Sequence, residues 1–553
     1  MIFILALCFS ILLTTILVPL FMKIGTRLSI VDEPGVRKIH TQAIPTTGGI
    51  ALIIGSLIPF IFLVKNNRLI SGICLGALCI LVVGLIDDVW DLNYKWKFFG
   101  QLLAATVTLL VSDIRINPIV ELWSGATVNL KMISFPLSLL FLVATSNIIN
   151  LADGLDGLAG GICLLIFCCT GFFAYLRAGF QIIALCICII GAIIGFLRYN
   201  TYPAIVFLGD TGSLFLGFSV GISMILLTSG HSIYSPAVIL YIIGVPIFDT
   251  SLVILERLME HRSIFKADKN HIHHKLLQIG FKHNEAVVII YTVQLLMILL
   301  AWKLRFFTDG ILLIIYLVLM SAVLGFFLLN KKGYLLIPHI HRRLDQKNRD
   351  LISAQQGLLS KKTACRVAWY GLIGGMLLFC LLSPFIMRPV SRDIGIICFV
   401  LILCILMMQK FTSRIIKVIL RFSAYFISLF YISFLEFQLP PFRHIYNILF
   451  IGMGICYLFF LITTLEKIPF FPIDYLLLGM VIFTFFLPKT YPGLVHLNNI
   501  AARVLFMIFS IELLFYKLKE EKFRLMLYSI LFALGVTCAI AFWPFLKIFN
   551  LSA

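Results

Sequence analysis

Residues 70–91 read ISGICLGALCILVVGLIDDVWD, a long apolar run that ends in three aspartates. The apolar part approaches the length of about 20 residues that a helix needs to cross a bilayer. Asp87, Asp88 and Asp91 therefore stand where a membrane-spanning segment reaches its boundary. Because ionisable side chains at membrane depth are costly, their positions predict a functional site.

The composition extends this interpretation to the whole chain. Apolar residues make up 61% of the 553 residues, charged residues only 12%, and the mean hydropathy is +1.06. These values are typical of a polytopic membrane protein and exclude a soluble fold. We predict an all-α transmembrane helical bundle with about 11 core spans and about 7 extra C-terminal spans from residue 367 onwards. The core spans are expected near residues 2–22, 48–64, 70–86, 98–112, 132–148, 157–175, 180–197, 213–228, 235–255, 286–302 and 310–330.

The loops between these spans carry an uneven charge. Loops after odd-numbered spans hold 22 lysine and arginine residues, and loops after even-numbered spans hold 7. The positive-inside rule then places the odd loops in the cytoplasm and the N-terminus outside. The net charge of +19 has the same origin. A basic stripe with interleaved aromatics is missing, so we expect a lipid bilayer and no nucleic acid as partner.

The chain divides at residues 331–366, a polar segment that we interpret as a basic cytoplasmic linker. All polar clusters lie before it, so residues 1–330 are the expected catalytic transmembrane domain. Residues 367–553 form a C-terminal transmembrane domain whose role the sequence does not indicate.

The first polar cluster is the aspartate run at the end of the third span, with Lys97 behind it. Residues four apart share one helix face, so Asp87 and Asp91 are expected to point together. Repulsion between the adjacent Asp87 and Asp88 raises one pKa towards that of a general base, or attracts a cation. A solvated helix end paired with Lys97 is the alternative.

The second cluster closes the fifth span, where Asn147, Asn150, Asp153 and Asp156 recur every three residues. On a regular α-helix this spacing turns by about 60° per step, so the set winds round the helix end. The glycine after each aspartate frees the backbone for close approach to a ligand. The stripe suits contacts to a nucleotide or a sugar, or support for a metal; a polar seam between helices is the alternative.

The third cluster, Phe207 to Ser213, reads FLGDTGS and leads into the eighth span. Asp210 suits a hard cation, since Mg²⁺ prefers one or two carboxylates together with substrate phosphates. Free backbone N–H groups at a helix start also favour anions. A simple helix-capping role for Asp210 is the alternative.

The fourth cluster is His271, His273 and His274, in a basic loop after the ninth span. Three histidines on the face that carries the carboxylates indicate phosphate binding; a zinc site is the alternative, although no matching cysteine lies nearby. Asp249, near the end of the ninth span, is expected either to pair with a structural cation or to meet substrate.

Taken in order, these motifs resemble the polyprenyl-phosphate N-acetylhexosamine-1-phosphate transferase family over residues 1 to about 330. The resemblance rests on Asp32…Arg37-Lys38…His40, Asp87-Asp88…Asp91, Asn147…Asp156, Phe207…Ser213 and His271…His274. It implies transfer of HexNAc-1-phosphate from a UDP-N-acetylhexosamine to undecaprenyl phosphate, releasing UMP and starting synthesis of a cell-envelope polysaccharide such as the lipopolysaccharide O-antigen. It also implies the bacterial cytoplasmic (inner) membrane, with the active site facing the cytoplasm.

The resemblance further implies roles for individual residues. Asp210 binds Mg²⁺, for which Mn²⁺ can substitute, and Asp88 supports this metal site. Asp87 either deprotonates the lipid phosphate or acts as a nucleophile. The catalytic set is completed by Asp88, Asp91 and Lys97. Phe207 stacks on uracil. The expected substrate-binding residues are Asn147, Asn150, Asp153, Asp156, Phe207, His271, His273, His274, Arg37, Lys38 and His40.

The pattern His271-Ile-His-His, followed by Lys275, resembles the GlcNAc-1-phosphate branch, so UDP-GlcNAc is the favoured donor. The related phospho-MurNAc-pentapeptide transferase of peptidoglycan synthesis is one alternative. A transporter of anionic substrates, with Asp249 as coupling residue, is another; it would call for inverted repeats and paired broken helices. Whether the chain forms a homodimer stays open.

Overall fold

The fold was analysed in a computed structural model, which describes residues 2–33, 43–64, 67–116, 119–123, 126–129, 131–177, 179–229, 234–259, 261, 271–331, 369–379, 392–408, 420–421, 423–432, 443–463, 472–485, 497–517 and 530–541. The chain forms two compact units, residues 2–342 with 471–476, and residues 343–470 with 477–553. Each unit is described by itself. The predicted linker falls almost entirely outside the described residues, so its role stays a prediction.

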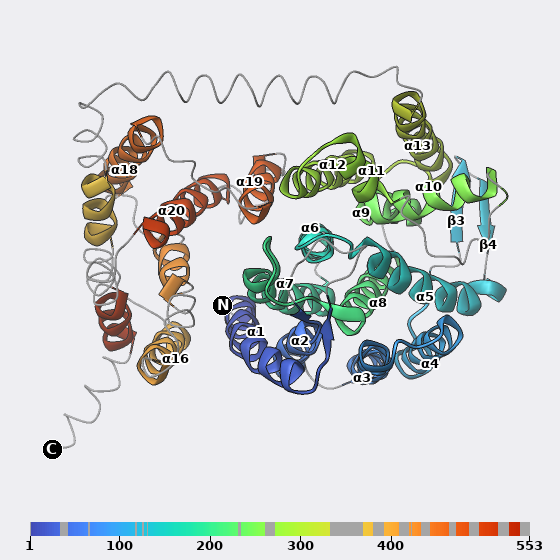
Figure 1. The fold of residues 1–553 in the computed structure, drawn as a ribbon, viewed down its shortest axis with the longest axis horizontal. Helices are drawn as coiled ribbons and strands as arrows, with labels where there is room; N and C mark the ends of the chain where they lie inside the picture. The colour runs from blue at the N-terminus through green and yellow to red at the C-terminus, as the bar shows by residue number, and fades with distance from the viewer. Residues whose placement is uncertain are drawn as a thin grey trace. The chain divides into compact units, whose positions relative to one another are not determined.

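The first unit is a bundle of helices, as predicted (Figure 1). Its helices are α1 (Ile2–Arg27), α2 (Gly48–Leu63), α3 (Arg68–Trp90), α4 (Tyr94–Ser112), α5 (Ser134–Ala152), α6 (Leu158–Leu176), α7 (Phe180–Asn200), α8 (Gly209–Thr228), α9 (Ile239–Ile242), α10 (Val245–Met259), α11 (Ile272–Ile279), α12 (His283–Leu304) and α13 (Asp309–Lys331), with short 3-10 turns η1 (Lys131–Ile133) and η2 (Pro236–Val238). Among the described residues, 8 helices are long and apolar enough to cross a membrane, or 9 if one bent pair is a single span. The all-α polytopic bundle is confirmed.

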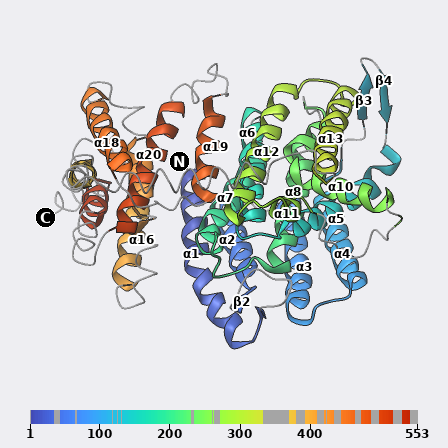
Figure 2. The same cartoon turned by 45° about the horizontal axis from the view of Figure 1, so that its top comes forward.

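Two short antiparallel pairs of strands accompany these helices. β1 (Val31–Asp32) pairs with β2 (Ile44–Pro45), and β3 (Ile119–Trp123) pairs with β4 (Ala126–Asn129). The β3–β4 hairpin lies beside α13 (Figure 2). Neither pair extends into a larger sheet within the described part of the chain, so the helices carry the fold.

Helix α8 forms the centre of the first unit, in contact with α2, α3, α5, α6 and α7 (Figure 1). Glycines allow its first turn to meet two neighbours at backbone distance. A Cβ atom added to Gly49 of α2 would lie 2.3 Å from Gly212 N, and one added to Gly84 of α3 would lie 2.4 Å from Thr211 Cα. These contacts fix the start of α8, and therefore Asp210, against α2 and α3.

The ninth predicted span, 235–255, is not one continuous helix. The segment 236–242 and helix α10 meet at a bend of 89°. Gly244 lies at the bend with a φ of 41°, which favours glycine, and Pro246 follows in the first turn of α10. The expected span is therefore bent, because a Gly-Val-Pro sequence interrupts an otherwise uniform apolar run.

The C-terminal part of the chain is also helical where it is described. It comprises helices Trp369–Phe379, α16 (Arg392–Met408), Ser423–Ile432, α18 (Arg443–Thr463), α19 (Pro472–Phe485), α20 (Leu497–Lys517) and Ile530–Ala541. The division into a catalytic and a C-terminal domain stays a prediction.

Candidate active site

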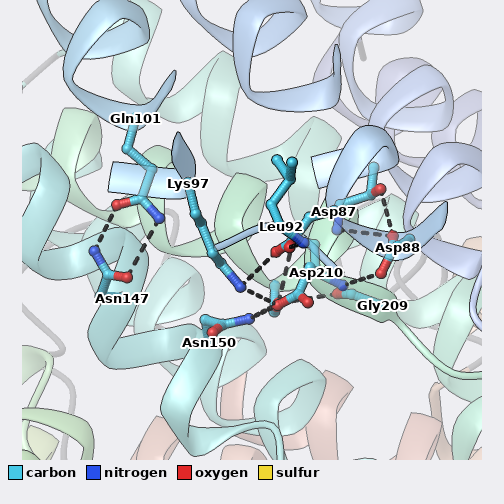
Figure 3. A network of polar contacts seen from close by, with 11 residues as sticks. Asp87, Asp88, Leu92, Lys97, Gln101, Asn147, Asn150, Gly209 and Asp210 are labelled. Atoms are coloured by element: carbon cyan, nitrogen blue, oxygen red, sulfur yellow. Dashed lines mark hydrogen bonds and ion pairs between the residues drawn. The ribbon is translucent and has the colours of Figure 1, made fainter. Parts of the chain in front are cut away.

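One lysine joins carboxylates from two distant parts of the sequence. Lys97 Nζ lies 2.7 Å from Asp87 Oδ2 and 2.7 Å from Asp210 Oδ1 (Figure 3). These side chains come from α4, α3 and α8 respectively. Asn150 of α5 donates a hydrogen bond to Asp210 Oδ1 and a second, of 2.8 Å, to Ser213 Oγ. Four helices thus converge on one charged cluster, which we call the lysine cluster: Asp87, Lys97, Asn150 and Asp210.

Asp88 points away from Lys97 and caps the start of α8. Its Oδ1 accepts a hydrogen bond of 2.7 Å from Asp210 N, and its Oδ2 accepts bonds from Thr211 N at 3.1 Å and Thr211 Oγ1 at 2.6 Å. Gly209, with a φ of 69°, leaves room for this carboxylate, since a Cβ there would lie 2.7 Å from Asp88 Oδ2. Asp88 therefore positions Asp210, and both of its oxygens already accept hydrogen bonds from α8.

Asp91 does not share a helix face with Asp87. Helix α3 ends at Trp90, and Asp91 follows in the left-handed region with a φ of 48° and an exposed side chain. The expectation that the two carboxylates point together was wrong, because the four-residue periodicity ends where the helix ends.

The lysine cluster fits Mg²⁺. Two carboxylates, Asp87 and Asp210, converge on the Lys97 ammonium, and the buried Asp87 Oδ2 has no hydrogen-bond partner among the described residues besides that ion pair. Within the described ranges no three His, Cys, Asp or Glu side chains are grouped as metal ligands. Mg²⁺ does not require such a group, because it is held by one or two carboxylates plus substrate phosphates and water.

The polar stripe of the fifth span divides at the end of its helix. Asn147 and Asn150 lie on α5, which ends at Ala152, whereas Asp153 and Asp156 lie in the turn before α6. The predicted winding round a regular helix therefore stops at Asn150. Asn147 exchanges two hydrogen bonds with Gln101 of α4, of 3.3 Å and 2.5 Å, and is not among the side chains that contact Asp210 (Figure 3).

Gln101 was missed in the sequence. It is almost fully buried and lies four residues after Lys97 on α4, so both side chains share one helix face. A glutamine at that spacing within an apolar segment was a signal that would have linked α4 to α5.

The turn after α5 is tied to the loop before α8. Asp156 Oδ2 accepts a hydrogen bond of 2.9 Å from Ala204 N. Asn200, another residue that the sequence did not single out, accepts one of 3.0 Å from Gly157 N and donates one of 2.9 Å to Val206 O. These bonds bring the second and third motifs together.

Phe207 is fixed by its backbone. Its N–H donates to Pro45 O at 2.8 Å, and its carbonyl accepts from Gly48 N at 3.1 Å. The ring is half-buried, three residues before Asp210. The segment before α2 therefore holds the loop that carries both residues.

Asp153 has no hydrogen bond or ion pair to a described residue through its carboxylate. Burial raises its pKa to about 7, and the negative charges of Asp210, Asp156 and Asp88 act in the same direction. Asp153 is therefore electrostatically coupled to the lysine cluster without touching it.

The histidine motif opens helix α11 and packs against the second motif. His271 Nδ1 lies 2.8 Å from Asp249 Oδ2, and its ring is parallel to that of His273, with centroids 5.7 Å apart. The ring of His274 is tilted against that of His273, with 4.2 Å between ring centroids. A Cβ added to Gly154 would lie 2.2 Å from His273 Nε2. Asp249 therefore pairs with a histidine side chain.

His273 is an uncharged imidazole at neutral pH. Burial lowers its pKa to about 3, and the neighbouring His274 and His271 act in the same direction against the opposing effect of Asp249. It can bind a phosphate oxygen through one N–H group, but not as a cation. Arg37, Lys38 and His40 lie outside the described residues.

These features define a polytopic membrane protein with a charged site at the ends of its helices. Residues 70–228 match glycosyl transferase family 4. The chain is 32% identical over 347 residues to a probable undecaprenyl-phosphate N-acetylglucosaminyl 1-phosphate transferase of Bacillus subtilis, a match covering 61% of this chain and 96% of that protein.

Two further relatives extend the comparison. A decaprenyl-phosphate N-acetylglucosaminephosphotransferase of Mycolicibacterium smegmatis is 31% identical over 48% of this chain and 73% of its own length. A phospho-N-acetylmuramoyl-pentapeptide-transferase of Acetivibrio thermocellus is 29% identical over 55% of this chain and 96% of its own length. The chain belongs to the polyprenyl-phosphate N-acetylhexosamine-1-phosphate transferase family, which confirms the resemblance drawn from the motifs.

Proposed function

We propose that this protein transfers GlcNAc-1-phosphate from UDP-GlcNAc to undecaprenyl phosphate in a Mg²⁺-dependent reaction that releases UMP. An oxygen of the lipid phosphate attacks the β-phosphorus of the donor, and the bond from that phosphorus to the bridging oxygen breaks. UMP leaves, while the sugar–phosphate bond stays intact. The observation that carries the proposal is the Lys97 ammonium held between the carboxylates of Asp87 and Asp210.

Phosphoryl transfer depends mainly on positioning and on neutralising charge. Mg²⁺ held by Asp210, with Asp87 beside it, would neutralise phosphate charge. Asp88 and Asn150 orient Asp210 through its backbone N–H and its carboxylate. Asp87 takes the proton when the lipid phosphate arrives protonated, and Lys97 attracts the incoming phosphates.

The donor is assigned to the neighbouring motifs. Asp153, Asp156 and Phe207 lie on the turns that the side chains of Asp156 and Asn200 tie together, so they suit the uridine end. The buried His273, packed on Gly154, suits a neutral hydrogen bond to the diphosphate. Both substrates then meet at the cytoplasmic face of the inner membrane, as the positive loops indicate.

GlcNAc is favoured as the sugar because the names of the Bacillus and Mycolicibacterium relatives specify transfer of an N-acetylglucosaminyl phosphate. The pentapeptide transferase relative, matched over almost its whole length, supports UDP-MurNAc-pentapeptide as a second candidate donor.

The test uses the full chain in purified membranes with undecaprenyl phosphate, Mg²⁺ and radiolabelled UDP-GlcNAc. Labelled lipid and an equal amount of UMP are expected, and chelation of the metal should abolish both. A parallel panel with UDP-GalNAc and UDP-MurNAc-pentapeptide identifies the sugar. If none of the UDP-HexNAc donors yields a lipid product, the proposal is refuted.

A further inference from the structure

The second half of the broken span, α10, is connected through His271 and His273 to Gly154. Gly154 lies in the turn of Asp153 and Asp156, which we assigned to the donor and call the donor motif. Asp249, in the first turns of α10, is buried, and so is its partner His271. Its Oδ2 lies 2.8 Å from His271 Nδ1, and its Oδ1 accepts a hydrogen bond of 2.7 Å from Ile272 N. Each carboxylate oxygen therefore has a partner at the start of α11.

The same contacts orient the imidazoles. A carboxylate cannot donate a hydrogen bond, so the contact requires a proton on His271 Nδ1. The parallel rings then continue from His271 to His273, whose Nε2 packs where Gly154 lacks a side chain. Gly154 follows Asp153 directly, so the contacts run from Asp249 to the motif assigned to the donor.

We propose that Asp249 is a positioning residue for the nucleotide-sugar donor: it sets the protonated nitrogen of His271 and anchors α11, so that His273 packs against the backbone of Gly154. Asp249 acts through the histidines and does not meet substrate itself. The inference rests on the proposed function, because it assigns the histidine motif to the UDP-sugar.

Asp249→Asn separates this role from simple packing. The amide oxygen is expected to keep the hydrogen bond from Ile272 N, which leaves the NH₂ group facing His271 Nδ1. His271 Nδ1 must then accept a hydrogen bond from this NH₂ group, so the ring proton of His271 moves from Nδ1 to Nε2. The side-chain volume hardly changes, whereas the tautomer of His271 is reversed. Asp249→Glu keeps the carboxylate and should restore part of the loss.

Asp309→Asn is a matched control. Asp309 is equally buried, and its Oδ1 accepts a hydrogen bond of 2.9 Å from Ala237 N, at the start of η2 on the other part of the same broken span. It therefore tests the general cost of removing a buried carboxylate that caps this span.

The experiment measures KM for UDP-GlcNAc, KM for undecaprenyl phosphate and kcat, together with hydrogen exchange of the α11 amides in the full chain. For Asp249→Asn we expect KM for the donor to rise about tenfold, a loss of about 1.4 kcal/mol of binding. KM for the lipid should stay within twofold, and exchange of the α11 amides at 273–276 should accelerate. Asp309→Asn should leave the donor KM unchanged.

An unchanged donor KM in Asp249→Asn, or equal effects in Asp309→Asn, would overturn the inference. Failure of the inference about Asp249 can be distinguished from failure of the proposed function. If the unaltered protein forms no lipid product from any UDP-HexNAc, the proposed function fails, and the exchange measurement still decides whether Asp249 anchors α11.

Discussion

Two junctions in this protein use buried aspartates in different ways. At the junction of α3, α4 and α8, Asp87 and Asp210 share the ammonium of Lys97. At the junction of α10 and α11, Asp249 is bound by a main-chain N–H and an imidazole. A metal can displace a flexible ammonium from its carboxylates, and the ammonium can then pair with a phosphate, whereas a main-chain N–H cannot leave. The first junction is therefore suited to chemistry and the second to placing a segment of chain.

Asp88 shows that this distinction applies to individual residues. It neighbours Asp87 in sequence, yet both of its oxygens accept bonds from the start of α8. Because main-chain N–H groups bind it, as at Asp249, Asp88 positions a segment of chain and does not take part in the chemistry. Substitutions at the two junctions should thus differ in size and in kind.

The largest effect is expected at the lysine cluster. Asp210→Asn removes a carboxylate from Lys97 and from the expected metal site, so transferase activity should fall about 10³-fold, the size seen when a preorganised charged contact is lost. The measurement is the initial rate of lipid product formation at saturating Mg²⁺. Asp113→Asn is the control, because Asp113 forms an exposed ion pair with Arg115. Wild-type activity in Asp210→Asn would remove this residue from the chemistry.

A smaller, mixed effect is expected for Asp88→Ala. Loss of the cap on α8 should lower the free energy of unfolding by about 1–2 kcal/mol and, because Asp210 shifts with the helix start, reduce the rate more than stability alone explains. Thermal unfolding and initial rates of the same preparation test this. Asn67→Ala removes an ordinary cap, the bond from Ile70 N to Asn67 at the start of α3, and should lower stability without this loss of rate. Equal losses of rate in both variants would contradict the positioning role.

A still smaller effect is expected where the second junction meets the donor motif. Gly154→Ala places a methyl group where His273 Nε2 lies, so the imidazole must move. KM for the UDP-sugar should rise a few-fold while kcat changes little. In Gly325→Ala the new methyl group meets no atom of the described residues within 4 Å, and this variant should behave as the unaltered protein does. A Gly154→Ala protein with an unchanged donor KM would separate His273 from donor binding.

The smallest effect concerns stability against pH. The pKa of His273 is lowered to about 3 by burial, whereas in the unfolded chain it is about 6.5. Between these values the unfolded state binds the extra proton, so stability falls as the pH drops below about 6.5. His273→Gln should flatten that decline, as followed by thermal unfolding in detergent between about pH 7 and pH 5. An identical slope in both proteins would show that His273 is not buried neutral.

The helical bundle was predictable from the sequence because apolar length alone identifies spanning segments. The break between 236–242 and α10 was not predicted, since an apolar run with an internal glycine and proline has the composition of a continuous span. Its signal, Gly244 before Pro246, was present in the sequence.

The site was predictable as a set of residues but not as a set of contacts. Asp87, Lys97 and Asp210 were identified by residue type, yet the capping of α8 by Asp88 joins positions 122 residues apart. Local periodicity carries no information about which helices lie side by side. The pairs Asn147–Gln101 and Asp249–His271 were hidden for the same reason.

The attachment of Asp210 to α3 has a consequence for building hybrids between relatives. Asp87 contacts the Lys97 ammonium, and the next residue, Asp88, accepts hydrogen bonds from the start of α8. Inserting a single residue before them would rotate each carboxylate by about 100° around the helix and disrupt both contacts. The glycine contact between Gly84 and Thr211 sets the same register. Helices α3 and α8 are therefore one exchangeable unit: a hybrid protein should take both from the same parent, although more than a hundred residues separate them in the sequence.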